Sequence, residues 1–230
     1  MGGGHARPRG GSVSYTGTVT VGGPADTRQA GDLVISKVTV GPMDNDSYLL
    51  RCTDTGSQLL IDAAADAPTL LALAGDGGLE TVVTTHRHFD HVGALAEVVE
   101  ATGATTAAGR NDAEGIPVPT DRPLADGDVV RVGTCELEVI ELVGHTPGAI
   151  ALLYRGDPER PHLFTGDCLF PGGPGNTFGD AAAFTQLMDD LESKVFDRLP
   201  DETWIYPGHG ADTTLGAERP NLAEWRARGW

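Results

Sequence analysis

The most informative stretch of this chain is Thr85-His86-Arg87-His88-Phe89-Asp90-His91. Four side chains that can bind a metal fall within it, in the order His-x-His-x-Asp-His. Residues 80–84 are rich in β-branched side chains and predict a strand, whereas the apolar spacing over residues 91–102 predicts a helix. Imidazole and carboxylate ligands on a turn between the two suit zinc, iron or manganese. The alternative reading is a polar surface turn with incidental histidines.

Length and composition indicate one globular domain and exclude some classes of partner. The chain has 230 residues, of which 40% are hydrophobic, and this is enough for a single core. Its 33 acidic and 16 basic residues leave a formal net charge of −17. Nucleic-acid phosphates and anionic membrane surfaces both require clustered Lys and Arg. We therefore expect neither nucleic acid nor membrane as a partner.

Cysteine usage and the N-terminus predict a cytoplasmic protein. The three cysteines, Cys52, Cys135 and Cys168, are far apart and form neither a disulfide framework nor a Cys-x-x-Cys zinc site. Free thiols fit a reducing compartment. The N-terminus lacks the apolar segment of a secretion signal, and no apolar run approaches the length of a membrane span.

The order of predicted elements favours a two-sheet sandwich. Residues 1–30 are rich in Gly, Ser, Thr and Pro and predict a flexible lead-in with a short strand at 17–21; residues 31–230 form the domain. Predicted strands lie at 33–35, 37–40, 48–50, 58–61, 80–84, 104–108, 129–132, 135–142, 150–154, 162–165 and 204–206. Predicted helices lie at 67–73, 91–102, 181–199 and 222–228, and predicted loops at 112–126 and 170–180. Because many strands join through turns too short for crossovers, we expect two sheets face to face with helices outside.

Three further predicted strands end in loops that each offer one ligand beside glycines. These ligands are His145, Asp167 and His209. Glycine suits backbone that turns sharply near a metal. His162 opens a strand without such a turn, so we interpret it as a surface or packing histidine, and we assign no role to His5 in the lead-in.

These motifs resemble the metallo-β-lactamase superfamily from about Asp32 to the C-terminus. Its five motifs occur in order, as Asp62 after a strand, the cluster at 86–91, His145, Asp167 and His209. The resemblance implies an α/β (α+β) fold, a four-layer αββα sandwich of two mixed sheets, with a dinuclear metal centre at one edge. It assigns the ligands as follows: His86, His88 and His145 to one metal, Asp90, His91 and His209 to the other, and Asp167 as the bridge.

This ligand set predicts hydrolysis by a metal-bridging hydroxide. Two metals roughly 3.5–4 Å apart can share one hydroxide, and the pKa of bound water falls to about 7. Asp90 can both bind a metal and orient that hydroxide, which makes it the predicted catalytic residue. Asp62 would hold a ligand or the ligand loop from behind, with a strand-end cap as the alternative. We expect two divalent ions, zinc first, with iron and manganese left open.

Segments 164–170 and 206–219 resemble the small single-domain glyoxalase II-like, or hydroxyacylglutathione hydrolase-like, members. This resemblance implies cleavage of thioesters such as lactoyl-glutathione, whose thiolate leaves without a strong general acid. Such members often carry a Gly-Arg-x-Asp-like stretch after the bridging Asp, but residues 175–180 contain no arginine. The longer C-terminal helical domain that grips glutathione in larger members is also missing after His209, so the thiol carrier stays open. We predict that four residues line the pocket: Phe170, Asn176, Thr177 and Arg219.

Several alternatives remain at this stage. A persulfide dioxygenase uses a similar ligand set with a single iron, and a lactonase or another ester hydrolase needs the same hydroxide. A non-catalytic metal-binding scaffold is the non-enzyme alternative, against which the full ligand set speaks. Cys168, beside Asp167, is predicted to be structural rather than a ligand. The resemblance leaves a monomer and a homodimer both open.

Overall fold

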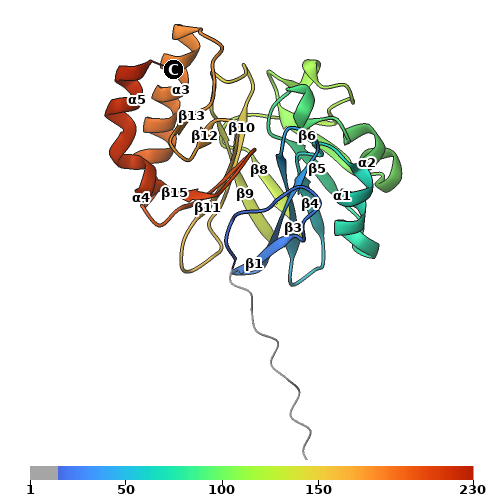
Figure 1. Cartoon of the computed structure of the whole chain (residues 1–230). Coiled ribbons are helices and arrows are strands. Elements are labelled where there is room, and N and C mark those ends of the chain that lie inside the picture. Colours follow the sequence, from blue (N-terminus) through green and yellow to red (C-terminus); the bar gives the residue numbers. More distant parts are fainter. Residues whose placement is uncertain (1–14, 230) are drawn as a thin grey trace, which may run out of the picture.

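Two β-sheets packed face to face form the centre of the computed structural model, which describes residues 15–229 (Figure 1). The first sheet has the strand order β1-β2-β3-β4-β5-β6-β7, and the second has the order β15-β14-β11-β10-β9-β8. The first sheet comprises β1 Asp26–Ala30, β2 Leu33–Val40, β3 Asn45–Cys52, β4 Gln58–Ile61, β5 Thr81–Thr84, β6 Thr105–Gly109 and β7 Arg122–Leu124. The second comprises β8 Val129–Val132, β9 Cys135–Glu141, β10 Ile150–Tyr154, β11 His162–Gly166, β14 Trp204–Pro207 and β15 Thr213–Thr214.

Helices cover the outer face of each sheet, which confirms the four-layer αββα sandwich (Figure 1). Neighbours from β4 to β7 run parallel, and the crossovers in the first two of these steps carry the helices α1 Ala67–Ala74 and α2 Leu95–Thr102. The second sheet is antiparallel except for the pair β11 and β14. Its outer face is covered by α3 Ala181–Asp190 and α5 Leu222–Arg228, with the short α4 Leu215–Glu218 beside them.

Both faces of the central strands are buried, which explains their uninterrupted apolar runs. On β4, Leu59 and Ile61 point into the core between the sheets, whereas Leu60 packs toward α1 and α2. On β10, Leu152 faces the core between the sheets and Leu153 packs beneath α3. Strands buried on both faces do not alternate in polarity, so length and flanking turns identify them in the sequence.

The elements at the sheet edges differ from the sequence predictions. The prediction of a strand at 17–21 is wrong; the first strand within residues 15–229 is β1, which pairs antiparallel with β2 and lies within the predicted lead-in. The predicted loop 112–126 contains β7, an edge strand that tolerates Pro123 because one side of it needs no hydrogen bond. His5 lies outside the described residues.

Other differences concern short elements that lack a periodic pattern. The predicted loop 170–180 contains the two-residue ribbon β12 Leu169–Phe170 and β13 Gly173–Pro174. The helix predicted at 91–102 is split into the 3₁₀ turn η2 Phe89–His91 and α2, and the helix predicted at 181–199 ends in the π-helical turn η4 Leu191–Phe196. Within residues 15–229, no helix combines the length and the apolar character needed to cross a membrane.

A buried lysine joins the N-terminal segment to the sandwich. The side chain of Lys37 is fully buried, and its Nζ lies 3.0 Å from Asp46 Oδ2 and 2.7 Å from Asp212 Oδ1. It also donates to the carbonyl oxygens of Gly17, at 3.0 Å, and Gly210, at 2.6 Å. The hydroxyl of Tyr15 donates to Asp212 Oδ2 at 2.7 Å. One cation on β2 therefore joins a carboxylate on β3 of the first sheet to the carboxylate and loop that precede β15 of the second sheet, and it also holds the N-terminal segment.

Removing this cation should destabilise the fold strongly. We expect Lys37→Met to lower the free energy of unfolding by about 3–5 kcal/mol, because two buried carboxylates lose their counter-charge. The matched control is Arg131→Met, which removes an exposed strand cation paired with Glu136 at 2.6 Å and should cost less than about 1 kcal/mol. Denaturant unfolding of both variants measures the difference, and equal losses would contradict the assignment.

Candidate metal centre

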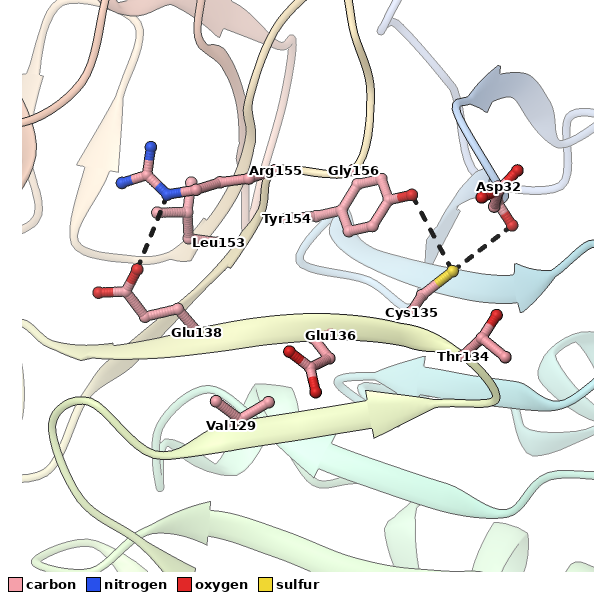
Figure 2. Close-up of a pocket in the computed structure, with 10 residues that line it drawn as sticks. All are labelled: Asp32, Val129, Thr134, Cys135, Glu136, Glu138, Leu153, Tyr154, Arg155 and Gly156. Carbon is pink, nitrogen blue, oxygen red and sulfur yellow. Dashed lines mark hydrogen bonds and ion pairs between the residues drawn. The ribbon is translucent and has the colours of Figure 1, made fainter.

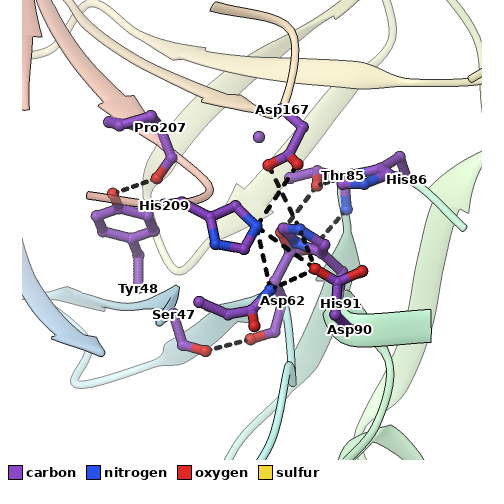
Figure 3. Close-up of polar contacts among 12 residues, drawn as sticks. Ser47, Tyr48, Asp62, Thr85, His86, Asp90, His91, Asp167, Pro207 and His209 are labelled. Carbon is purple, nitrogen blue, oxygen red and sulfur yellow. Dashed lines mark hydrogen bonds and ion pairs between the residues drawn. The ribbon is translucent and has the colours of Figure 1, made fainter. Parts of the chain in front are cut away.

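One carboxylate at the end of β4 organises the ligand loop (Figure 3). Asp62 Oδ1 accepts from the backbone N–H of Thr85 at 2.7 Å, and Oδ2 accepts from the Thr85 hydroxyl at 2.8 Å. The same Oδ2 accepts from His91 Nδ1 at 2.9 Å. Asp62 has a φ of 57°, a left-handed conformation that aspartate tolerates better than most residues. The expectation that Asp62 holds both a ligand and the loop therefore agrees with its contacts.

Four histidines use Nδ1 for a hydrogen bond, so Nε2 is left to face the centre. His91 donates to Asp62, His145 to the carbonyl of Asn176 at 2.8 Å, and His209 to the carbonyl of Met43 at 3.0 Å. His86 Nδ1 lies 3.0 Å from the Thr85 hydroxyl oxygen, whose proton is already given to Asp62. Such partners fix the tautomer in which Nε2 carries a lone pair and can bind a metal.

The inward-facing atoms lie at the separations that ligands of one ion require. His91 Nε2 is 3.3 Å from Asp167 Oδ1, and Asp167 Oδ2 is 3.5 Å from His209 Nε2 and 3.6 Å from His145 Nε2. Tetrahedral bonds of about 2.0–2.1 Å place ligand atoms roughly 3.3 Å apart. The Nε2 atoms of His86, His91 and His145 and Asp167 Oδ1 are buried without a hydrogen-bond partner. Unpaired buried polar atoms are costly, so this cluster fits bound metal.

Three overlapping groups within residues 15–229 could each hold an ion. They are His86, His88 and His145; His86, His91 and Asp167; and Asp90, His91 and His209. In every group the ligand atoms lie within 4.8 Å of one another. The structure thus brings together all seven residues that the resemblance assigns to the two metals, with Asp167 between the two sides. Such an arrangement indicates a dinuclear site.

Glycine is required where the backbone passes the bridging carboxylate. A Cβ at Gly208 would overlap Asp167 Oδ1 and come within 2.8 Å of the His91 ring. A Cβ at Gly175 would overlap the carbonyl oxygen of Asp167. The loops that carry His209 and Asn176 can therefore approach the ligands only because these two positions lack a side chain.

Protonation of the cluster depends on burial and on its carboxylates. Burial lowers the pKa of His86 well below its ordinary value and also lowers the pKa of His145, which keeps both imidazoles neutral. Burial opposes the charged form of His91 too, but Asp167 and Asp62 outweigh it and raise the pKa of His91 to about 10. A metal must therefore displace a proton from His91, and its affinity should fall as the pH falls.

Two residues that the sequence did not single out support the ligands. Asn45 Nδ2 donates to Asp90 Oδ2 at 3.0 Å and lies 3.3 Å from His209 Nε2. Asp112 is fully buried and accepts from the backbone N–H of Arg87 at 3.0 Å and from the Thr146 hydroxyl at 2.6 Å. Asp112 thereby ties the ligand loop to the loop that carries His145. It lies in a stretch without periodic pattern, so no sequence signal marked it.

The four predicted pocket residues differ in how close they lie to the metal centre. The ring centroid of Phe170 is 6.4 Å from that of His209, and Asn176 holds His145 through its carbonyl, so both border the centre. Thr177 is buried and its hydroxyl donates to the carbonyl of Asp180 at 3.2 Å. Arg219 is not brought to the centre; its guanidinium bonds Asp201 and the carbonyls of Phe196 and Leu199.

Two other residues with metal-capable side chains have structural surroundings. His162 is fully buried, with Nδ1 2.8 Å from the Tyr206 hydroxyl and Nε2 2.8 Å from Asp157 Oδ2, which makes it a packing histidine. Cys168 is buried and donates to the carbonyl of Leu142 at 3.5 Å. Burial raises the pKa of its thiol well above the ordinary value, so Cys168 does not offer a thiolate.

A hollow of about 410 Å³ lies apart from the seven predicted metal ligands, none of which lines it (Figure 2). Cys135 points into it, with Sγ 3.5 Å from the Asp32 carbonyl and 4.0 Å from the Tyr154 hydroxyl. Burial raises the pKa of Cys135 to about 11. Arg155 pairs with Glu138 at 3.8 Å across the same hollow. Because of this raised pKa, the Cys135 thiol is protonated near neutral pH. We therefore assign the chemistry to the histidine cluster.

The metallo-beta-lactamase superfamily model matches residues 40–209. The chain belongs to this superfamily. It is 39% identical over 183 residues to the hydroxyacylglutathione hydrolase of Polaromonas sp., a match that covers 77% of this chain and 66% of that relative. It is 40% identical over 168 residues to the hydroxyacylglutathione hydrolase of Cereibacter sphaeroides, with coverage of 72% and 62%. The chain thus spans slightly less than two thirds of the length of these curated relatives.

Solved structures of similar proteins share the fold of this superfamily member. ETHE1 from Myxococcus xanthus superposes with a TM-score of 0.73 at 30% identity, covering 84% of each chain. The di-iron-bound form of TTHA1623 superposes with a TM-score of 0.63 at 35% identity, covering 80% of this chain and 96% of that one. The second of these relatives holds two metal ions, in line with the dinuclear arrangement found here.

The contacts of Asp62 lead to a prediction about metal affinity. Asp62→Asn should weaken metal binding about 10- to 100-fold, because His91 and Thr85 lose a charged acceptor. Asp66→Asn is the matched control, since Asp66 also follows β4, has a φ of 53° and caps α1, a role that asparagine can fill. Competition with a chromogenic chelator measures both affinities. Unchanged affinity in Asp62→Asn would contradict the role assigned to Asp62.

Proposed function

We propose that this protein is a dinuclear-metal hydrolase that cleaves thioesters, and that it is glyoxalase II-like. The observation that carries the proposal is the meeting of two three-residue ligand groups at the carboxylate of Asp167, which lies 3.6 Å from His145 Nε2 on one side and 3.3 Å from His91 Nε2 on the other. Similarity to hydroxyacylglutathione hydrolases at 39% and 40% identity supports the thioester. A single-iron dioxygenase uses a similar ligand set, so the number and kind of bound metal ions separate the two reactions.

Different residues around that centre have different proposed roles. Two divalent ions, when bound, would supply an acidified water and polarise the thioester carbonyl. We propose zinc because the ligands are imidazoles and carboxylates, a donor set that also accepts iron and manganese. Asn45 holds the carboxylate of Asp90, whose side chain is 11% exposed and therefore open to a water. Asp90 is placed to orient that water and accept its proton, and the thiolate departs without a strong acid.

We also propose a cytoplasmic setting and a small-molecule substrate. The three cysteines are free and buried, as is usual where thiols stay reduced. The net charge of −17 disfavours binding to nucleic acid or to an anionic membrane surface. A measurement of the protein's mass in solution distinguishes a monomer from a homodimer.

Replacing the proposed base should reduce turnover sharply. We expect Asp90→Asn to lower kcat/KM for a lactoyl thioester by about 10²- to 10⁴-fold, the usual contribution of a positioned base. Asp44→Asn is the control, because Asp44 is exposed on the neighbouring loop and has no assigned contact with the ligands. Metal content is measured for both variants, so that loss of a ligand is separated from loss of the base. Full activity in Asp90→Asn would contradict the mechanism.

Metal analysis with a substrate panel tests the proposed reaction. We expect about two zinc-type ions per chain, turnover of lactoyl thioesters ahead of lactones and cephalosporins, and no oxygen uptake with a persulfide. One iron per chain with oxygen uptake would instead establish the dioxygenase. Tight metal binding with no turnover of any substrate in the panel would favour the metal-binding scaffold.

A further inference from the structure

A small apolar hollow adjoins the metal centre on the side of Asp90. Its volume is about 170 Å³, roughly the liquid volume of five to six water molecules. Its apolar lining comprises Pro42, Met43, Ala64, Ala65, Phe89 and Gly93. The remaining lining residues are Asn45 and Asp90, so the hollow opens directly onto the proposed base.

The two largest apolar side chains of this hollow are unusually exposed. Phe89 is 74% exposed and Met43 is 47% exposed. Within residues 15–229, the only other large hydrophobic side chains so exposed are Val21 and Phe178, and the Phe178 ring lies 5.6 Å from that of His88. Exposed apolar groups gathered beside one site are typical of ligand-binding grooves and interaction surfaces.

The walls of the hollow are held by the contacts that hold the metal ligands. The carbonyl of Met43 accepts from His209 Nδ1 at 3.0 Å. Phe89 lies between the ligands His88 and Asp90 in the 3₁₀ turn η2. The apolar surface therefore has a set position relative to the reacting atoms, as a substrate-orienting pocket requires.

The charge of the lining selects the kind of group that can enter. No Lys or Arg is among the residues that line the hollow, and Asp90 contributes a carboxylate. A carboxylate of the substrate would meet no counter-charge there and would face Asp90. An apolar chain would cover Phe89 and Met43 and gain free energy from their burial.

We propose that this hollow receives an apolar acyl chain, so that the preferred substrates are acyl thioesters with a chain of several carbons rather than the short, hydroxylated lactoyl group. This inference rests on the proposed thioester hydrolysis, and it assigns Phe89 and Met43 as the residues that determine acyl specificity.

A chain-length series tests the acyl pocket. The metal-loaded protein is assayed with acetyl, butyryl and hexanoyl thioesters of N-acetylcysteamine, which share one thiol. Each fully buried methylene is worth up to about fourfold, so kcat/KM should rise at least about tenfold from acetyl to hexanoyl. Met43→Ser and Phe89→Ser should flatten the rise. Val21→Ser, which removes an equally exposed apolar side chain outside the hollow, should preserve it.

Binding without turnover provides a second readout. The hexyl thioether of N-acetylcysteamine should bind at least about tenfold more tightly than the methyl thioether, as measured by calorimetry, and Met43→Ser should abolish this gain. Met43→Ser decides the outcome if Phe89→Ser loses metal, because Met43 contributes only its carbonyl to a ligand.

The results separate this inference from the proposed function. Equal cleavage of acetyl and hexanoyl thioesters, or an equal rise in Met43→Ser and Val21→Ser, overturns the acyl pocket and leaves thioester hydrolysis standing. Failure to cleave any thioester, with hexyl still favoured over methyl in binding, overturns the hydrolysis and leaves the apolar pocket standing. Failure in both assays overturns both.

Discussion

The carboxylate of Asp62 is the contact on which the metal centre depends. Asp62 directly follows β4, a strand buried on both faces, so its position is as rigid as the first sheet. Its three hydrogen bonds hold Thr85 and His91 directly, and through the Thr85 hydroxyl it sets the tautomer of His86. One charged group therefore converts a flexible turn into a preorganised set of imidazoles, at the cost of a strained backbone at its own position.

The centre is arranged for binding rather than for the stability of the fold. Buried Nε2 atoms and Asp167 Oδ1 lack partners, and each such atom costs on the order of 1–3 kcal/mol. The close approach of the His209 loop further demands glycine at Gly208. Among the described residues, the other buried side-chain atoms without a hydrogen-bond partner are Asp46 Oδ2, which lies 3.0 Å from Lys37 Nζ, and Arg160 Nε. Four of the six unpaired atoms therefore gather at this one edge of the sandwich, where bound cations would offset their cost.

Polarity changes abruptly at the rim of the centre. Ligands and carboxylates occupy the interior, whereas Phe89, Met43 and Phe178 present apolar surface around it. Phe178 has a φ of 57° and its backbone N–H donates to Asn176 Oδ1 at 2.7 Å, while the Asn176 carbonyl holds His145. The contacts of Asn176 that position Phe178 therefore also orient the ligand His145. The same loops therefore position two kinds of side chain: polar ones that bind the metals and apolar ones that we propose contact the substrate.

Sequence alone predicted the candidate ligands, which the structure brings together, and most of the regular elements, because these depend on short-range patterns. The spacing at 86–91, the glycines beside His145, Asp167 and His209, and the apolar runs of the central strands are all local signals. They predicted the two-sheet sandwich, and the structure confirms it.

Tertiary structure decided the features that depend on partners far along the chain. Asn45 meets Asp90 and His209, Asp112 joins Arg87 to Thr146, and Arg219 bonds the end of η4 instead of the centre. The edge strands β1 and β7 likewise form only because β2 and β6 offer them a free edge. A hydrogen bond between distant residues leaves no periodic trace in the sequence, so only the packed chain shows which polar side chains meet.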